Sequence, residues 1–309
     1  MDKDAKVFIA GVNNLIGLGL KDYLEKKGFT KVLSEETDKV NLLRQEQVES
    51  LFKEIRPEYV FLAHYKSGGI TANIKYPAEF IYENLQVQNN IINASYKSKV
   101  KRLAYFASSC VYPKACPQPM KEEYLLTGAL EETSEAYALA KLAGIKMCQA
   151  YNRQYGTDFI SIIPATAFGP QDHLDSETSH VLGSLIKRFH EAKVNKQEAV
   201  TVLGTGRPQR EFIYIDDLVE AAVILAQDSN APGIINVGSA QDISIGELAK
   251  LVGKIIGFKG RILFNNAKID GVSEKLLDSS RTSSLGWRPR FSLKEGIKLT
   301  YNWYKTPRA

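Results

Sequence analysis

Over its first half, the chain alternates short apolar stretches with amphipathic stretches of helical length. Strands are expected at residues 6–10, 31–33, 59–62, 102–107 and 159–163, and helices at 15–27, 46–55, 77–95 and 135–155. Two parallel strands need a crossover between them, and a helix is the usual crossover. The alternation therefore predicts an α/β fold, a Rossmann-like doubly wound parallel sheet with helices on both faces.

After Pro170 the alternation gives way to loops, although a helix at 216–226 and a strand at 233–237 repeat the earlier pattern. We therefore expect residues 1–165, joined by about 212–240, to form a dinucleotide-binding Rossmann domain. Residues 166–211 and 241–309 would form a smaller α/β domain that faces the substrate. Ligands of such sheets bind beyond the carboxyl ends of the strands, where Gly11 and Ser108 fall.

The composition limits the classes of function. With 44% hydrophobic and 24% charged residues, the 309-residue chain resembles an ordinary soluble protein, and no apolar run approaches the roughly 20 residues that span a bilayer. Three cysteines form no disulfide framework and four histidines lack metal-ligand spacing, so we expect a cytoplasmic protein without a metal. The net charge of +5 suits an anionic ligand such as a nucleotide, but no dense basic tract indicates nucleic acid.

A glycine-containing loop, Gly11-Val-Asn-Asn-Leu-Ile-Gly17, joins the first expected strand to its helix. In this position the pyrophosphate of a dinucleotide rests on the N-terminus of a helix. The middle position, often glycine, is Asn14, which tolerates left-handed backbone conformations better than most residues. A plain glycine turn is the alternative interpretation. The candidate cofactor-binding residues of the loop are Gly11, Asn13, Asn14, Leu15, Ile16 and Gly17.

Two carboxylates, Glu35 and Glu36, lie near the end of the second expected strand. A carboxylate there accepts hydrogen bonds from the adenosine ribose and repels a 2′-phosphate, which favours NAD. A solvated acidic turn is the alternative.

Tyr137 and Lys141 lie four residues apart on an expected helix and so share one face. A neighbouring ammonium group lowers the pKa of a tyrosine, and the phenol then becomes a usable proton donor in carbonyl reduction with a nicotinamide cofactor. The spacing alone does not identify the pair, because two others share it: Tyr23 with Lys27, and Tyr301 with Lys305.

Several longer runs carry a resemblance that covers nearly the whole chain. They include Gly68-Gly-Ile70, Tyr76-Pro-Ala-Glu-Phe-Ile-Tyr-Glu-Asn84, Ser108-Ser-Cys-Val-Tyr-Pro113, Ser179-His-Val181, Arg210-Glu-Phe212 and Leu285-Gly-Trp287. The chain resembles the extended short-chain dehydrogenase/reductase superfamily and, within it, the GDP-L-fucose synthase family. The resemblance selects Tyr137 with Lys141 among the three pairs.

The resemblance implies 3,5-epimerisation and 4-keto reduction of GDP-4-keto-6-deoxy-D-mannose to GDP-L-fucose, with NADP(H) as cofactor. Ser108 would hydrogen-bond the carbonyl oxygen, Tyr137 would protonate it, and Lys141 would also contact the nicotinamide ribose. Cys110 would act as the epimerising base and His180, also near the cofactor, as the acid. Without the resemblance, Cys110 would be interpreted as a small buried residue and His180 as an ordinary loop histidine.

The resemblance also implies a sugar-nucleotide pocket in the smaller domain and a homodimer built on helices around Asn84 and Lys146. Guanidinium groups suit diphosphate oxygens, although surface charge is the alternative for each arginine. The candidate substrate-binding residues are Ser109, Arg188, Arg210, Lys275 and Asp278.

The chain departs from the family pattern mainly in residues that select ligands. Besides Asn14, acidic Glu35 and Glu36 stand where basic residues are usual, so NAD(H) is possible. The stretch 164–170 lacks a usual asparagine, and Leu203 replaces a frequent tryptophan. The alternatives are a sister enzyme acting on another nucleotide-linked 4-ketosugar, of the colitose or 6-deoxyheptose type, or a non-catalytic nucleotide-binding protein of the same fold.

Overall fold

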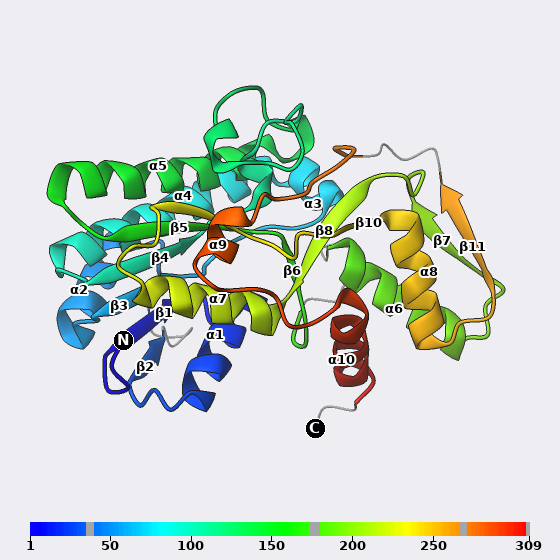
Figure 1. Cartoon of the computed structure of the whole chain (residues 1–309), viewed down its shortest axis with the longest axis horizontal. Helices are drawn as coiled ribbons and strands as arrows, with labels where there is room; N and C mark the ends of the chain where they lie inside the picture. The colour runs from blue at the N-terminus through cyan, green and yellow to red at the C-terminus, as the bar shows by residue number, and fades with distance from the viewer. Residues whose placement is uncertain (35–39, 173–179, 266–270, 307–309) are drawn as a thin grey trace.

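The computed structural model describes residues 1–34, 40–172, 180–265 and 271–306. Figure 1 shows a large sheet covered by helices at one end of the molecule and smaller sheets with their own helices at the other. Glu35 and Glu36 lie outside the described residues. In the part of the chain that the structure describes, no helix is long and apolar enough to cross a membrane.

A six-stranded sheet forms the centre of the larger part, with the strand order β2-β1-β3-β4-β5-β9 and every neighbouring pair parallel. Strands β1, β4 and β5 are buried along their whole length, as expected where helices cover both faces of a parallel sheet. The strands are β1 (Val7–Ala10), β2 (Val32–Ser34), β3 (Tyr59–Leu62), β4 (Arg102–Phe106), β5 (Phe159–Pro164) and β9 (Ile234–Val237).

Helices cover both faces of this sheet. Helices α1 and α7 pack together on one face, and α2, α4 and α5 lie on the other (Figure 1). Their bounds are α1 (Leu15–Lys26), α2 (Gln45–Ile55), α4 (Pro77–Lys97), α5 (Glu135–Tyr155) and α7 (Ile215–Gln227). The predicted doubly wound α/β fold is confirmed. The chain reverses its direction of winding between β1 and β3, which is where such sheets bind ligands.

The smaller part contains two short sheets. One has the order β10-β8-β6, with β8 antiparallel to β10 and parallel to β6, and the other pairs β7 with β11 in parallel. Helix α8 packs against both α6 and α10. The elements are β6 (Thr166–Phe168), α6 (Val181–Val194), β7 (Ala199–Leu203), β8 (Gln209–Tyr214), β10 (Asp242–Ser244), α8 (Ile245–Ile256), β11 (Arg261–Asn265) and α10 (Leu293–Lys305).

Helices α6, α8 and α10 were not predicted from the sequence. Among the described residues, five short helical turns between the larger elements were not predicted either, because they lack a full amphipathic repeat. They are α3 (Ile70–Lys75), α9 (Ser280–Ser284) and the 3₁₀ turns η1 (Ser109–Val111), η2 (Glu122–Tyr124) and η3 (Glu132–Ser134). Of these, η1 directly follows β4 and carries two of the predicted site residues.

Candidate active site

The loop between β1 and α1 turns tightly against the end of β3. Gly11 has φ +102°, and a Cβ added there would lie 2.5 Å from the backbone nitrogen of His64. A Cβ added to Gly17 would lie 1.9 Å from the carbonyl oxygen of Gly11. Both positions therefore require glycine, the first for backbone conformation and close approach and the second for close approach alone. This close-packed turn before a helix N-terminus is suited to the pyrophosphate of a dinucleotide.

Asn14 does not adopt the left-handed conformation that made asparagine seem a tolerable replacement for glycine. Its backbone is extended, with φ −126° and ψ 168°, and it is the N-cap of α1. Its Oδ1 accepts hydrogen bonds from the N–H groups of Ile16 (3.0 Å) and Gly17 (3.1 Å). Its Nδ2 donates to the carbonyl of Ala63 at 3.0 Å. Asparagine here caps a helix and ties it to the end of β3.

Ser108, Cys110 and Tyr137 meet beyond the end of β4. Ser108 is the N-cap of η1, and its Oγ accepts a hydrogen bond from the N–H of Cys110 at 3.3 Å. The hydroxyl of Tyr137, in the first turn of α5, interacts with the hydroxyls of Ser108 and Ser67. Two hydroxyl groups thus lie together, as the sequence analysis expects of a pair that binds one carbonyl oxygen. Ser67 was not predicted, since an isolated serine in a loop carries no distinguishing pattern.

Lys141 is almost completely buried, with 2% of its surface exposed. Its Nζ donates to the carbonyls of His64 and Phe106, each at 3.1 Å, and lies 5.1 Å from the centre of the Tyr105 ring. Burial lowers the pKa of Lys141 to about 7, so near neutral pH about half of the molecules carry its charge.

The pKa of Tyr137 is raised, first by burial and then by electrostatic interaction with Cys110 and Tyr65. The prediction that Lys141 lowers the pKa of Tyr137 is therefore wrong for this structure. The helical spacing is as expected, but the lysine ammonium is directed at backbone carbonyls and is itself partly neutralised by burial.

Cys110 lies in a positively charged environment. The Nζ of Lys275 is 3.6 Å from its sulfur. Burial acts to raise the pKa of Cys110, but the charge of Lys275, hydrogen bonds from Ser108 and Lys275, and the charge of Arg210 outweigh it, and the pKa is lowered. The arrangement favours the thiolate, which is the form of cysteine that accepts a proton.

His180 is the N-cap residue of α6 and is exposed at the surface of the chain. Enough protein surrounds it for desolvation to lower its pKa, and the charge of Lys275 lowers it further. Both effects favour the neutral imidazole. Because Lys275 acts on both Cys110 and His180, the structure brings the predicted base and acid to the same lysine.

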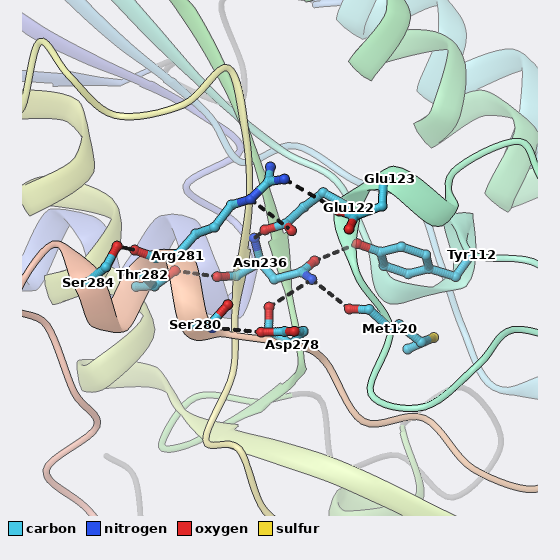
Figure 2. A network of polar contacts seen from close by, with 10 residues as sticks. All are labelled: Tyr112, Met120, Glu122, Glu123, Asn236, Asp278, Ser280, Arg281, Thr282 and Ser284. Carbon is cyan, nitrogen blue, oxygen red and sulfur yellow. Dashed lines mark hydrogen bonds and ion pairs between the residues drawn. The ribbon is translucent and has the colours of Figure 1, made fainter.

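The remaining predicted substrate-binding residues are more spread out. Arg210 lies at the start of β8 and acts electrostatically on Cys110, whereas Arg188 on α6 donates to the carbonyl of Thr201 on β7 at 3.2 Å. Ser109 is half-buried in η1. Asp278 accepts a hydrogen bond from the N–H of Ser280 at 2.9 Å, and the hydroxyl of Ser280 contributes most to lowering the pKa of Asp278. Figure 2 shows Asp278 beside the first turn of α9.

Comparisons with known proteins agree with this geometry. Residues 7–238 match the model of the NAD dependent epimerase/dehydratase family. GDP-L-fucose synthase 1 of Arabidopsis thaliana is 48% identical over 98% of this chain and 94% of its own length, and GDP-L-fucose synthase of Escherichia coli K12 is 42% identical over 97% and 96%.

Among solved structures, the GDP-mannoheptose C4 reductase of Campylobacter jejuni with NADP bound superposes with a TM-score of 0.89 at 38% identity, covering 99% of this chain and 100% of that one. On the family match and the full-length likeness to the curated enzymes, this chain belongs to the NAD-dependent epimerase/dehydratase family.

Proposed function

We propose that this enzyme converts GDP-4-keto-6-deoxy-D-mannose to GDP-L-fucose, by epimerisation at C3 and C5 and reduction of the 4-keto group with NADPH. The observation that carries the proposal is the position of Cys110. Its sulfur lies 3.6 Å from the Lys275 ammonium and shares Ser108 with Tyr137. An enzyme that only reduces a ketone has no use for a thiolate beside its proton donor. Epimerisation next to the ketone needs such a base.

The loop at residues 11–17 fits a dinucleotide, because a side chain at Gly11 or Gly17 would fill the space against which the backbone turns. We assign cofactor binding to this loop, with Lys141 and His180 at the nicotinamide end. Bound there, the cofactor supplies the hydride for reduction. The role of Glu35 stays a prediction, since it lies outside the described residues.

Reduction and epimerisation make the same demand on the carbonyl oxygen. Negative charge develops on this oxygen when a proton is removed from the neighbouring carbon. It develops again when hydride adds to the carbonyl carbon. Ser108 and Tyr137 would hydrogen-bond the oxygen in both steps, and Tyr137 would finally transfer its proton to it.

For epimerisation, Cys110 would remove the proton from the carbon beside the ketone, and Lys275 would stabilise the thiolate before that transfer. His180 would return a proton on the opposite face of the ring. Its lowered pKa makes its imidazolium a stronger acid than that of an ordinary histidine.

The smaller part of the molecule would hold the GDP group. Arg188, Arg210 and Lys275 supply positive charge for the diphosphate, and Ser109 and Asp278 are further candidates in the same pocket. We also propose the division into residues 1–165 with about 212–240, and 166–211 with 241–309. A homodimer in the cytoplasm is part of the proposal: α4 and α5 pack together and expose Tyr82, Leu139 and Tyr155, which suits a helical interface.

The test is incubation with GDP-4-keto-6-deoxy-D-mannose and NADPH in deuterium oxide. We expect oxidation of NADPH and deuterium at the carbons beside the ketone. A Cys110→Ser variant should lose deuterium incorporation far more than ketone reduction, and Cys116→Ser, a change at the half-buried cysteine six residues along the chain, should lose neither. Absence of NADPH oxidation by the unchanged enzyme would refute the proposal.

A further inference from the structure

Residues 274–278, here called the strap, place the Nζ of Lys275 3.6 Å from the Cys110 sulfur. The strap lies beside the loop before η2, where the N–H of Met120 donates to the carbonyl of Leu276 at 2.7 Å and the N–H of Asp278 donates to the carbonyl of Met120 at 2.9 Å. The position of the Lys275 ammonium beside the Cys110 sulfur therefore depends on what holds the strap.

One end of the strap is held by Asn236, a fully buried residue of β9. Its Nδ2 donates to the carbonyls of Met120 (2.9 Å) and Asp278 (3.1 Å), and its Oδ1 accepts the hydroxyl of Tyr112 at 2.6 Å. Figure 2 shows Asn236 at the centre of this network, between Tyr112 and Asp278. Asn236 thus fixes the end of the strap that is away from Cys110.

The middle of the strap is held by Glu211, which is only 2% exposed. Its Oε2 accepts the N–H of Leu277 at 2.9 Å, and its Oε1 accepts the N–H of Ala240 at 2.7 Å. The carboxylate occupies space that only a glycine leaves open, because a Cβ on Gly238 would lie 2.3 Å from Oε1. Burial raises the pKa of Glu211 to about 7, and the N–H groups of Leu277 and Ala240 act to lower it, so the carboxylate form depends on these two donors.

We propose that Glu211 is a positioning residue for the Cys110 thiol, acting by holding the strap so that the Lys275 ammonium lies against the sulfur. Leu277 is two residues from Lys275. Gln118 holds the residues on either side of Lys275, since its Oε1 accepts the N–H of Leu276 at 2.9 Å and its Nε2 donates to the carbonyl of Glu274 at 3.2 Å. Glu211 therefore sets the position of the ammonium together with Gln118. The catalytic importance of this arrangement rests on the proposed role of Cys110, whereas the arrangement itself can be tested on the thiol alone.

Glu211→Gln is the informative substitution. The side-chain oxygen of glutamine can replace only one of the two acceptor atoms, and its NH₂ group must then face a backbone N–H. If the oxygen stays with Ala240, the NH₂ group repels the N–H of Leu277 and displaces this part of the strap, while the hydrogen bonds of Gln118 and Asn236 to the strap remain. Moving the ammonium from 3.6 Å to about 5–6 Å from the sulfur should raise the thiol pKa by about one pH unit.

The experiment measures the rate of iodoacetamide reaction at Cys110 against pH, read by mass spectrometry of the peptide that contains it. We expect the midpoint for Glu211→Gln to rise by about one pH unit, with the rate at pH 7 falling several-fold. Lys275→Met should raise the midpoint at least as much, and the double variant should add nothing to Lys275→Met. Glu247→Gln is the matched control, since it makes the same chemical change in the capping box of α8.

An unchanged midpoint in folded Glu211→Gln, when Lys275→Met shifts it, would overturn the proposal. If Glu211→Gln does not fold, Glu211→Asp keeps the charge but shortens the reach to Leu277, and the same outcomes apply to it. Shifted midpoints in an enzyme that does not exchange substrate hydrogens would support the role of Glu211 in placing Lys275 and would count against the proposed function alone.

Discussion

Two substitutions of Asn14, to alanine and to aspartate, should rank in opposite orders for protein stability and for cofactor affinity. The side chain of Asn14 makes the three hydrogen bonds that join the start of α1 to the end of β3. Asn14→Ala removes an N-cap, which costs about 1 kcal/mol. It also removes the donor to Ala63, which costs about 1 kcal/mol more. The free energy of unfolding should therefore fall by roughly 2 kcal/mol.

Asn14→Asp separates these two contributions. It keeps the oxygen that caps Ile16 and Gly17 but loses the Nδ2 donor, so the loss should be about 1 kcal/mol. Urea unfolding of the cofactor-free enzyme, followed by circular dichroism, measures both variants. Asn13→Ala is the control, because Asn13 is the exposed neighbour. Equal losses of unfolding free energy for Asn14→Ala and Asn13→Ala would refute the capping role. Equal losses for Asn14→Ala and Asn14→Asp would show that the cap itself contributes nothing to stability.

The order should reverse for NADPH binding. Asn14→Asp places a negative charge at the helix N-terminus where we propose that the pyrophosphate binds. At about 5 Å and an effective dielectric constant of 20–40, the repulsion is roughly 2–3 kcal/mol, on the order of 100-fold in affinity. Asn14→Ala adds no charge and should bind NADPH more tightly than Asn14→Asp despite being less stable. Fluorescence titration with NADPH decides this, and equal affinities would place the pyrophosphate elsewhere.

Three further variants test buried groups. The folded pKa of Lys141 is about 7, below its ordinary value of 10.5, so between these pH values the unfolded chain binds more protons. The free energy of unfolding should thus rise between pH 7 and pH 10.5, by at most about 1.4 kcal/mol per pH unit. Urea unfolding at pH 7 and at pH 10 measures this rise, which Lys141→Met should lack. Gly144→Ala would place a Cβ 2.4 Å from Cζ of buried Tyr105 and should destabilise by about 1–3 kcal/mol, seen as a lower melting temperature. Tyr112→Phe leaves the buried Oδ1 of Asn236 without its donor and should cost about 1–3 kcal/mol in the same assay; no loss would show that the bond is replaced.

Local sequence pattern was enough to predict the central sheet, its helices and the glycine loop. Apolar stretches of strand length and helical periodicity depend on near neighbours, and Gly11 and Gly17 are required by a turn only seven residues long. The helical spacing of Tyr137 and Lys141 was likewise visible. Its electrostatic consequence was not, because burial of the lysine depends on β3 and β4, which are distant in sequence.

Contacts between remote segments could not be predicted. Cys110 and Lys275 are 165 residues apart, and no periodicity relates them. Glu211 was visible in the Arg210-Glu-Phe212 run, but only the fold shows that its carboxylate accepts the N–H of Leu277. Asn14 was noticed as an exception to glycine, yet its backbone angles depend on the carbonyl of Ala63 that its side chain binds.

The two carbonyls bound by Lys141 belong to the ends of different strands. His64 follows β3 and packs against Gly11 of the phosphate loop, and Phe106 ends β4 two residues before Ser108. One ammonium group therefore joins the half of the site where we propose that the cofactor binds to the half that carries Ser108. Its two hydrogen bonds join the two halves, so removal of this one side chain would loosen both at once. Any redesign that moves one half must also satisfy the geometry of this lysine.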